Sequence, residues 1–225
     1  SSVRFKENDL IMDEEIAIID SKTRNEKIKN FLIKNKKKLI IVFFLTLTII
    51  FILIGYYNHK ANVRIKISDD YNKATINFIS DKKINVKKEL INIVNSKDKT
   101  YSPLALYFLI DNNIIDESNV INQLFDTVIQ EIKLEKEVKN LIIYKKGLFN
   151  SEFETEDKLI KILKPLISTD SVWKSHALYL LGEYFYHKNE KQKAKDFYSQ
   201  LLSLENANLQ IKLQAQKRLN RDIGE

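Results

Sequence analysis

The chain has 225 residues, of which 44% are hydrophobic and 30% are charged, which is enough to build one domain with a buried core. Its net charge is +7, and residues 1–38, with ten basic and seven acidic side chains, supply +3 of that excess. The rest of the chain is nearly balanced in charge, which argues against a nucleic-acid surface. The absence of cysteine excludes disulfides and thiolate zinc sites.

Residues 39–57 form an apolar run with no charged side chain over nineteen positions. As a helix, the run would span roughly 28 Å, close to the thickness of the hydrocarbon core of a bilayer. A buried core helix would need a larger domain around it, and a cleaved signal peptide would have neither so long a charged segment nor so long an apolar one. The run therefore predicts a single transmembrane helix that ends at Tyr56 and Tyr57, whose rings favour the headgroup boundary.

The basic residues on the two sides of this run are unequal in number. Eight lie within about twenty residues on the N-terminal side and four on the C-terminal side. The eight are Lys22, Arg24, Lys27, Lys29, Lys34, Lys36, Lys37 and Lys38, and the four are Lys60, Arg64, Lys66 and Lys73. The positive-inside rule then predicts a cytoplasmic basic tail over residues 1–38 and a domain over residues 58–225 in the periplasm, with the anchor in a bacterial inner membrane.

The tract just before the anchor has a second interpretation. Lys36, Lys37 and Lys38 fit the positive-inside rule, which is the favoured explanation, but they also fit a site for anionic lipids. Ile28, Phe31 and Leu32 ahead of them follow helical spacing, so this part of the tail is expected to lie along the headgroups.

Residues 61–223 contain only two prolines and two glycines, a scarcity that favours helices over hairpins of strands. Apolar residues recur at helical spacing in a series of segments. The predicted helices cover 67–78, 86–94, 103–109, 116–132, 135–146, 154–163, 172–187, 191–204 and 209–223. Gly147 and Pro165 are expected to end the fifth and sixth of them. Strands at 65–67 and 141–144 are possible alternatives, but turn residues do not bracket them, so the predicted class is all-α.

One pair of predicted helices has the spacing of a tetratricopeptide unit. Leu181 and Gly182 are followed by Phe185, then by Ala194 twelve residues after the glycine and by Tyr198 four residues later. Small residues on both helices would let the two backbones approach closely, while the aromatic rings fill the space around them. The alternative is an ordinary helical hairpin. The preceding hairpins, at 101–131 and 136–164, lack this small-residue pattern, with Ile110 and Asn122 in the expected places of the first.

The order of these features resembles the tetratricopeptide-like family of the ancillary SecYEG translocon subunit (YfgM-like), in its alphaproteobacterial form. The resemblance covers about residues 25–222. It is carried by the basic tract 29–38, Tyr-Asn-Lys-Ala at 71–74, Thr-Tyr-Ser-Pro-Leu-Ala at 100–105, Leu-Lys-Pro-Leu at 163–166, Trp173 with Ala177, the Gly182 and Ala194 hairpin, and Lys212, Ala215 and Leu219. It implies a single anchor followed by a solenoid of helical hairpins, with the SecYEG translocon and periplasmic folding factors as partners.

Two sets of site residues follow from the repeat register. Trp173, Leu181, Gly182, Ala194 and Tyr198 are predicted to pack within and between repeats. The first helix of each hairpin lines the concave side of such an array. His176, Tyr179, Glu183, Tyr186 and His187 are therefore predicted to line a partner-binding groove, although some of these rings could equally pack on a neighbouring helix.

Catalytic chemistry has little support in the sequence. The three histidines are not spaced as metal ligands on one helix face, and no phosphate-binding glycine loop or nucleophile motif is present. The expected function is a non-enzymatic, protein-binding one, without cofactor, metal, small-molecule substrate or nucleic acid. The alternatives are a scaffold for envelope assembly or cell division and, from another class, an enzyme with an unrecognised site.

Overall fold

The computed structural model describes residues 23–80 and 85–223, which are helical with short connections and contain no strand within those ranges. The expected all-α class is confirmed. The chain divides into two compact units, Ser1–Val63 and Arg64–Glu225. Part of the predicted basic tail, residues 1–22, lies outside the described residues.

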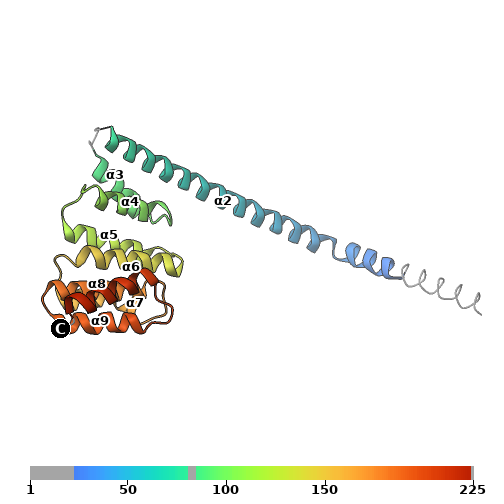
Figure 1. Ribbon diagram of the computed structural model, residues 1–225. Helices are drawn as coiled ribbons and strands as arrows, with labels where there is room; N and C mark the ends of the chain where they lie inside the picture. The colour runs from blue at the N-terminus through green and yellow to red at the C-terminus, as the bar shows by residue number, and fades with distance from the viewer. Residues whose placement is uncertain (1–22, 81–84, 224–225) are drawn as a thin grey trace, which may run out of the picture. The chain divides into compact units, whose positions relative to one another are not determined.

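The first unit contains a helix over residues 23–34 and the beginning of α2 (Lys36–Ile79), which starts in the blue part of Figure 1. α2 is long and apolar enough to cross a membrane, and its most apolar window is not buried by any described part of the chain. Thr46 and Thr48 donate their hydroxyls to the carbonyls of Phe43 and Phe44, each at 2.8 Å, so both polar side chains are satisfied within the helix.

The predicted helix over residues 67–78 is the end of α2 rather than a separate element. Ala74 is fully buried, and the side chains of Ile67, Tyr71 and Phe78 pack against the first core cluster. The ring of Phe78 meets the ring of Phe108 edge to face, with 5.4 Å between the centroids. The four-three-four spacing of these residues therefore marks a helix buried on one side, as predicted.

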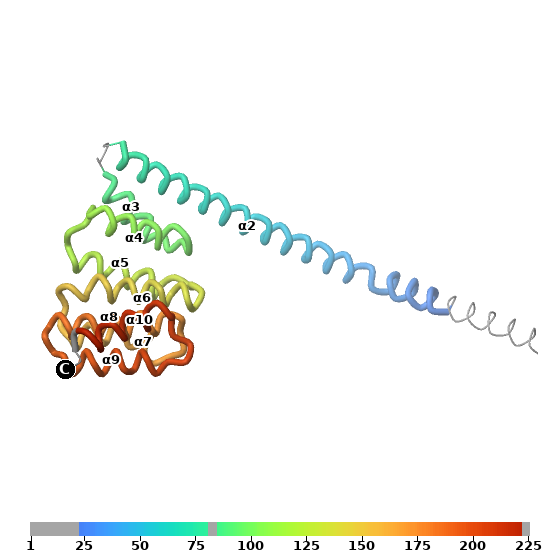
Figure 2. The backbone as a smooth tube through the Cα atoms, viewed as in Figure 1, coloured from blue at the N-terminus to red at the C-terminus, as the bar shows by residue number. Residues whose placement is uncertain are grey.

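The remaining helices follow in chain order with short connections (Figure 2). They are α3 (Val86–Asn95), α4 (Tyr101–Asp111), α5 (Ser118–Glu131), α6 (Lys136–Asn150), α7 (Glu156–Ile167), α8 (Lys174–His187), α9 (Lys191–Ser203) and α10 (Leu209–Arg218), with a π-helical turn over Leu219–Ile223. Most contacts join helices that are adjacent in sequence, and further contacts join α3 to α5, α6 to α8 and α10 to α8.

Two of the predicted helix ends are wrong. Gly147 lies inside α6, which continues to Asn150, and Pro165 lies inside α7, which continues to Ile167. A proline this close to a helix end removes only one backbone hydrogen bond, and Leu166 behind it is fully buried, so packing outweighs the loss. Gly147 lies inside the helix at a point where the side chain of Leu163 from α7 packs directly against it.

The core consists of two clusters of buried apolar side chains. One gathers residues from α2 to α6, and the other gathers residues from α6 to α10. α6 belongs to both, because Ile142 is buried in the first cluster and the adjacent Ile143 in the second. The middle helix therefore joins the two halves of the second unit into one body.

Candidate functional site

The α8/α9 hairpin has its closest contact at Gly182. A Cβ atom added to this glycine would lie 2.7 Å from Cδ1 and 2.8 Å from Cζ of Tyr198, so only a glycine fits there. Leu181, Ala194 and Tyr198 are fully buried around this contact. Four of the five predicted packing residues therefore gather in one place, but the group closest to Gly182 is the ring of Tyr198 rather than Ala194.

The α6/α7 hairpin repeats this contact. A Cβ atom added to Gly147 would lie 2.9 Å from Cγ of Leu163. Gly147 precedes Gly182 by 35 residues, and Leu163 precedes Tyr198 by the same interval. Hairpin 136–164 therefore has the small residue on its first helix, because its glycine is inside the helix that it was expected to end, but Leu159 occupies the place of Ala194 on its second helix.

The α4/α5 hairpin has the same spacing without a glycine. Leu109, Ile121 and Phe125 are buried at intervals of twelve and sixteen residues, which are the intervals from Gly182 to Ala194 and to Tyr198. The predicted positions, Ile110 and Asn122, are one residue further along and only partly buried. The register of this hairpin is therefore one residue earlier than the sequence indicated.

Three of the five predicted groove residues line one hollow of about 570 Å³. Tyr179, Glu183 and His187 contribute from α8, and Tyr144 and Leu148 contribute from α6. α6 and α8 are in contact, so the hollow lies between the first helices of two successive hairpins. Leu148 is 47% exposed, which leaves an apolar side chain at the edge of the hollow.

The α6 side of this hollow was not identified from the sequence, although a signal was present. Tyr144, Leu148 and Glu152 are each 35 residues ahead of Tyr179, Glu183 and His187. Alignment of the two hairpins on their glycines would have found all three residues.

A second hollow of about 470 Å³ continues the same surface toward α4. It shares Leu148 and Glu152 with the first hollow and adds Tyr107 from α4. The ammonium group of Lys145 lies 4.4 Å from the centre of the Tyr107 ring. Burial, together with the charge of Asp111, raises the pKa of Tyr107 to about 12, so this phenol keeps its proton at physiological pH.

The other two predicted groove residues, His176 and Tyr186, are not among the residues that line the first hollow. His176 packs against Tyr144 and Trp173, with ring centroids 5.7 and 5.0 Å away. Burial lowers the pKa of His176, so its ring is neutral at pH 7. Tyr186 lies beneath the guanidinium of Arg218 from α10, at 4.8 Å from ring centroid to Cζ.

Trp173 joins two hairpins, as a packing residue was expected to do. Its ring stacks on Tyr144 of α6 with 5.6 Å between centroids and 24° between planes. Trp173 is the residue before α8, so this contact fixes the start of one hairpin against the first helix of the hairpin before it.

Glu183 anchors the closing helix α10. Arg218 donates two hydrogen bonds to its carboxylate, at 2.8 and 2.7 Å, and the hydroxyl of Tyr198 donates a third. Burial alone would raise the pKa of Glu183, but these hydrogen bonds outweigh it and hold the pKa below its usual value. The carboxylate is therefore charged and already occupied, so it shapes the hollow more than it offers a free anion to a partner.

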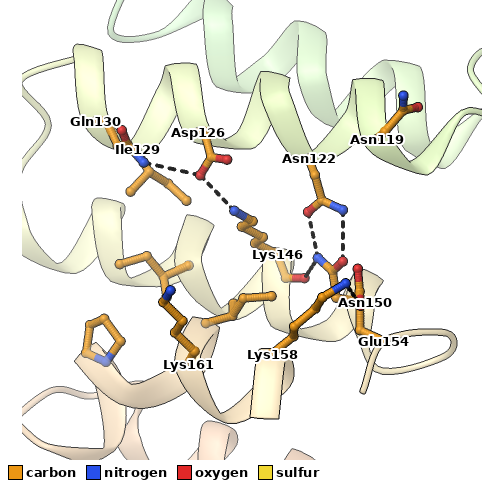
Figure 3. A pocket seen from close by; sticks show the side chains of 13 residues that line it. Asn119, Asn122, Asp126, Ile129, Gln130, Lys146, Asn150, Glu154, Lys158 and Lys161 are labelled. Carbon is orange, nitrogen blue, oxygen red and sulfur yellow. Dashed lines mark hydrogen bonds and ion pairs between the residues drawn. The ribbon is translucent and has the colours of Figure 1, made fainter. Parts of the chain in front are cut away.

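A third hollow of about 690 Å³ lies among α5, α6 and α7 (Figure 3). Asn122 and Asn150 exchange two side-chain hydrogen bonds there, at 2.9 and 2.8 Å. Lys146 donates to Asp126 at 2.7 Å beside them. Asn150 is buried and fully paired, so this polar network ties α5 to α6 and fixes the arrangement of two hairpins.

Within the described ranges, no three histidine, aspartate or glutamate side chains lie together in a way that could hold a metal ion. Compared with protein-family models, curated proteins and solved structures, the chain has no significant match.

Proposed function

We propose that this chain is a membrane-anchored, tetratricopeptide-like array of helical hairpins that binds other proteins. The main support is the buried contact between Gly147 and Leu163, which recurs 35 residues later between Gly182 and Tyr198. Periods of this length characterise solenoids, in which each hairpin buries its apolar face against the next. α6, which is shared by both core clusters, fits that description.

The proposed binding surface is the pair of hollows along α4, α6 and α8. Tyr107, Tyr144 and Tyr179 supply aromatic area along it, and Leu148 supplies an exposed apolar contact at its middle. Rigid aromatic side chains surrounded by polar groups suit the recognition of a helix or an extended segment of a partner. The surface is made of packed helices, so little ordering is needed when a partner binds.

The partners are those that the family resemblance implies, namely the SecYEG translocon and periplasmic folding factors. In this proposal, α2 crosses a bacterial inner membrane with the N-terminal tail in the cytoplasm, and the second unit receives exported chains in the periplasm. The eight-to-four distribution of basic residues supports this orientation. The function is non-enzymatic, and it uses no cofactor, nucleic acid or small-molecule substrate.

Site-specific photo-crosslinking in the native membrane would test the binding surface. A photoreactive amino acid at Leu148 should capture translocon subunits or periplasmic folding factors. The same probe at Leu213 on α10, which is 55% exposed and lies outside the two hollows, is the matched control. Equal capture from both positions would contradict the assigned surface. Capture of cell-division or envelope-assembly proteins alone would favour the scaffold function instead.

Replacement of the same two leucines would test the energetic role of the surface. Leu148→Ser should weaken partner capture severalfold, because an interface contact is lost, while helical content and thermal stability stay unchanged. Leu213→Ser should leave capture unchanged. A loss of capture accompanied by unfolding would instead mean that Leu148 serves the fold.

Protease treatment of spheroplasts would test the orientation. Residues 61–225 should be digested from outside, and the tail should remain protected. If the second unit survives until the membrane is broken, the proposed orientation and the periplasmic role are both wrong.

A further inference from the structure

The segment ahead of the apolar run forms an exposed helix over residues 23–34, which ends at a turn on Asn35 before α2 begins at Lys36. Ile28, Phe31 and Leu32 lie on its helical part, and each is half-exposed or more. At the joint, the backbone N–H of Asn35 donates to Phe31 at 3.0 Å, and the N–H of Leu39 donates to Asn35 at 2.9 Å. Asn35 is a turn between the two helices, so the faces of the first helix are assigned from residues 23–34 alone.

The lysines of this segment flank the apolar stripe on both sides. A helix turns about 100° per residue. Taking Ile28 as the centre, Lys27 and Lys34 fall on one flank of the stripe, and Lys29 falls on the other. Asn30 falls on the opposite face. Lys36, Lys37 and Lys38 follow the turn and add positive charge next to the apolar run. Residues 24–38 contain seven basic side chains and one acidic side chain, a net charge of +6 on an exposed surface.

This arrangement suits a helix that binds along the surface of an anionic lipid bilayer. Lysines on the flanks of an apolar stripe can extend their ammonium groups to headgroup phosphates while the stripe enters the acyl boundary. The positive-inside rule depends only on how many basic residues lie beside the anchor. Binding of a helix along an anionic lipid surface also depends on basic residues on both flanks of its apolar stripe. The segment is continuous with the apolar run that begins at residue 39, which would hold it at headgroup depth.

We infer that residues 24–38 form an anionic-phospholipid-binding segment, with Ile28, Phe31 and Leu32 of its helix inserted among the lipids and the flanking lysines on the phosphates. This site depends on the anchoring of α2 in a membrane and is independent of protein binding by Arg64–Glu225. A protein partner on this helix is the competing occupant, and the experiment below separates the two.

Spin labels on the full chain provide the test, since the absence of native cysteine allows a single cysteine at each position from 24 to 38. The labelled protein is reconstituted into phosphatidylcholine vesicles with or without phosphatidylglycerol. With the anionic lipid, accessibility to oxygen should peak at positions 28, 31 and 32, and accessibility to a water-soluble relaxant should peak at 26 and 30. The oscillation of accessibility along the sequence should weaken at high salt and in neutral vesicles.

A matched pair of substitutions separates the flanks from total charge. Lys29→Gln should lower the ratio of inserted to free helix about fivefold, the effect of about one lysine near an anionic surface. Lys29→Gln combined with Asn30→Lys restores the total charge but places it on the opposite face of the helix, so the ratio should stay within about twofold of that of Lys29→Gln. Recovery of the parent ratio in the double variant would overturn the proposal. So would an identical oscillation in neutral vesicles, or uniform exposure to water in both lipids, as expected if a protein partner is the occupant.

Discussion

The two C-terminal hairpins share a backbone arrangement but fill it with different side chains. In α8/α9, Gly182 meets the ring of Tyr198, and Phe185 stacks on Phe197 with 5.4 Å between centroids and 3° between planes. In α6/α7, Gly147 meets Leu163, and the position equivalent to Phe185 is Asn150, which pairs with Asn122. The close approach of two helices is therefore the repeated feature, and the chemistry around it varies.

The largest expected effect concerns Ala194, which occupies the place of Leu159 in the preceding hairpin. Both Ala194 and its neighbour Tyr198 are fully buried, so Ala194→Leu should destabilise the fold by about 3 kcal/mol through overpacking. Thermal or chemical unfolding would measure the loss. Lys195→Leu, at an exposed position of α9, is the control and should change stability little. Equal unfolding midpoints would mean that Ala194 does not lie in a close contact between α8 and α9.

The two glycines should respond unequally to alanine. Gly182→Ala should cost about 2 kcal/mol, because the added methyl meets a rigid, hydrogen-bonded ring. Gly147→Ala meets the flexible end of Leu163, and alanine gains about 1 kcal/mol in helix propensity over glycine, so its net cost should be under about 1 kcal/mol. Denaturant titration of both variants would measure the difference. A larger cost at Gly147 would contradict this account.

The amide pair should behave as a unit. Asn150→Leu leaves Asn122 without its partner and should cost about 1–2 kcal/mol, whereas Asn122→Leu combined with Asn150→Leu should recover most of that stability. A double-mutant cycle would measure the coupling. Additive losses would show that the pair makes no specific contribution to the contact between α5 and α6.

The smallest expected effect is the pH dependence of the stability that Glu183 gives to the packing of the closing helix α10. Since the pKa of Glu183 is lowered in the folded chain, its contribution to stability is complete above the unfolded pKa of about 4.3 and is lost as pH falls through the lower, folded value. Glu183→Gln should lower the melting temperature at pH 7, and the gap from the parent chain should close in acid. Glu190→Gln, which alters an exposed ion pair with Lys193, should show little change at either pH.

Much of the secondary structure could be predicted from the sequence, because apolar residues at helical spacing mark the side of each helix that is buried. The spacing of Leu181, Gly182 and Ala194 identified one hairpin for the same reason. The close contact in the α6/α7 hairpin was missed because a glycine in sequence is read as a helix end, and only a neighbouring helix gives it a packing role. Asn113 and Asn189 adopt left-handed conformations in turns between helices, a conformation that asparagine tolerates.

The sequence by itself determined the helical class, the apolar run at 39–57 and its flanking charges, because these depend on composition and on local periodicity. Only the tertiary structure decided that Gly147 and Pro165 lie inside helices, that Glu183 is held by Arg218 and Tyr198, and that Tyr144 and Leu148 face Tyr179. These features depend on side chains 15 to 35 residues apart in sequence, whose contacts exist only once the helices have packed.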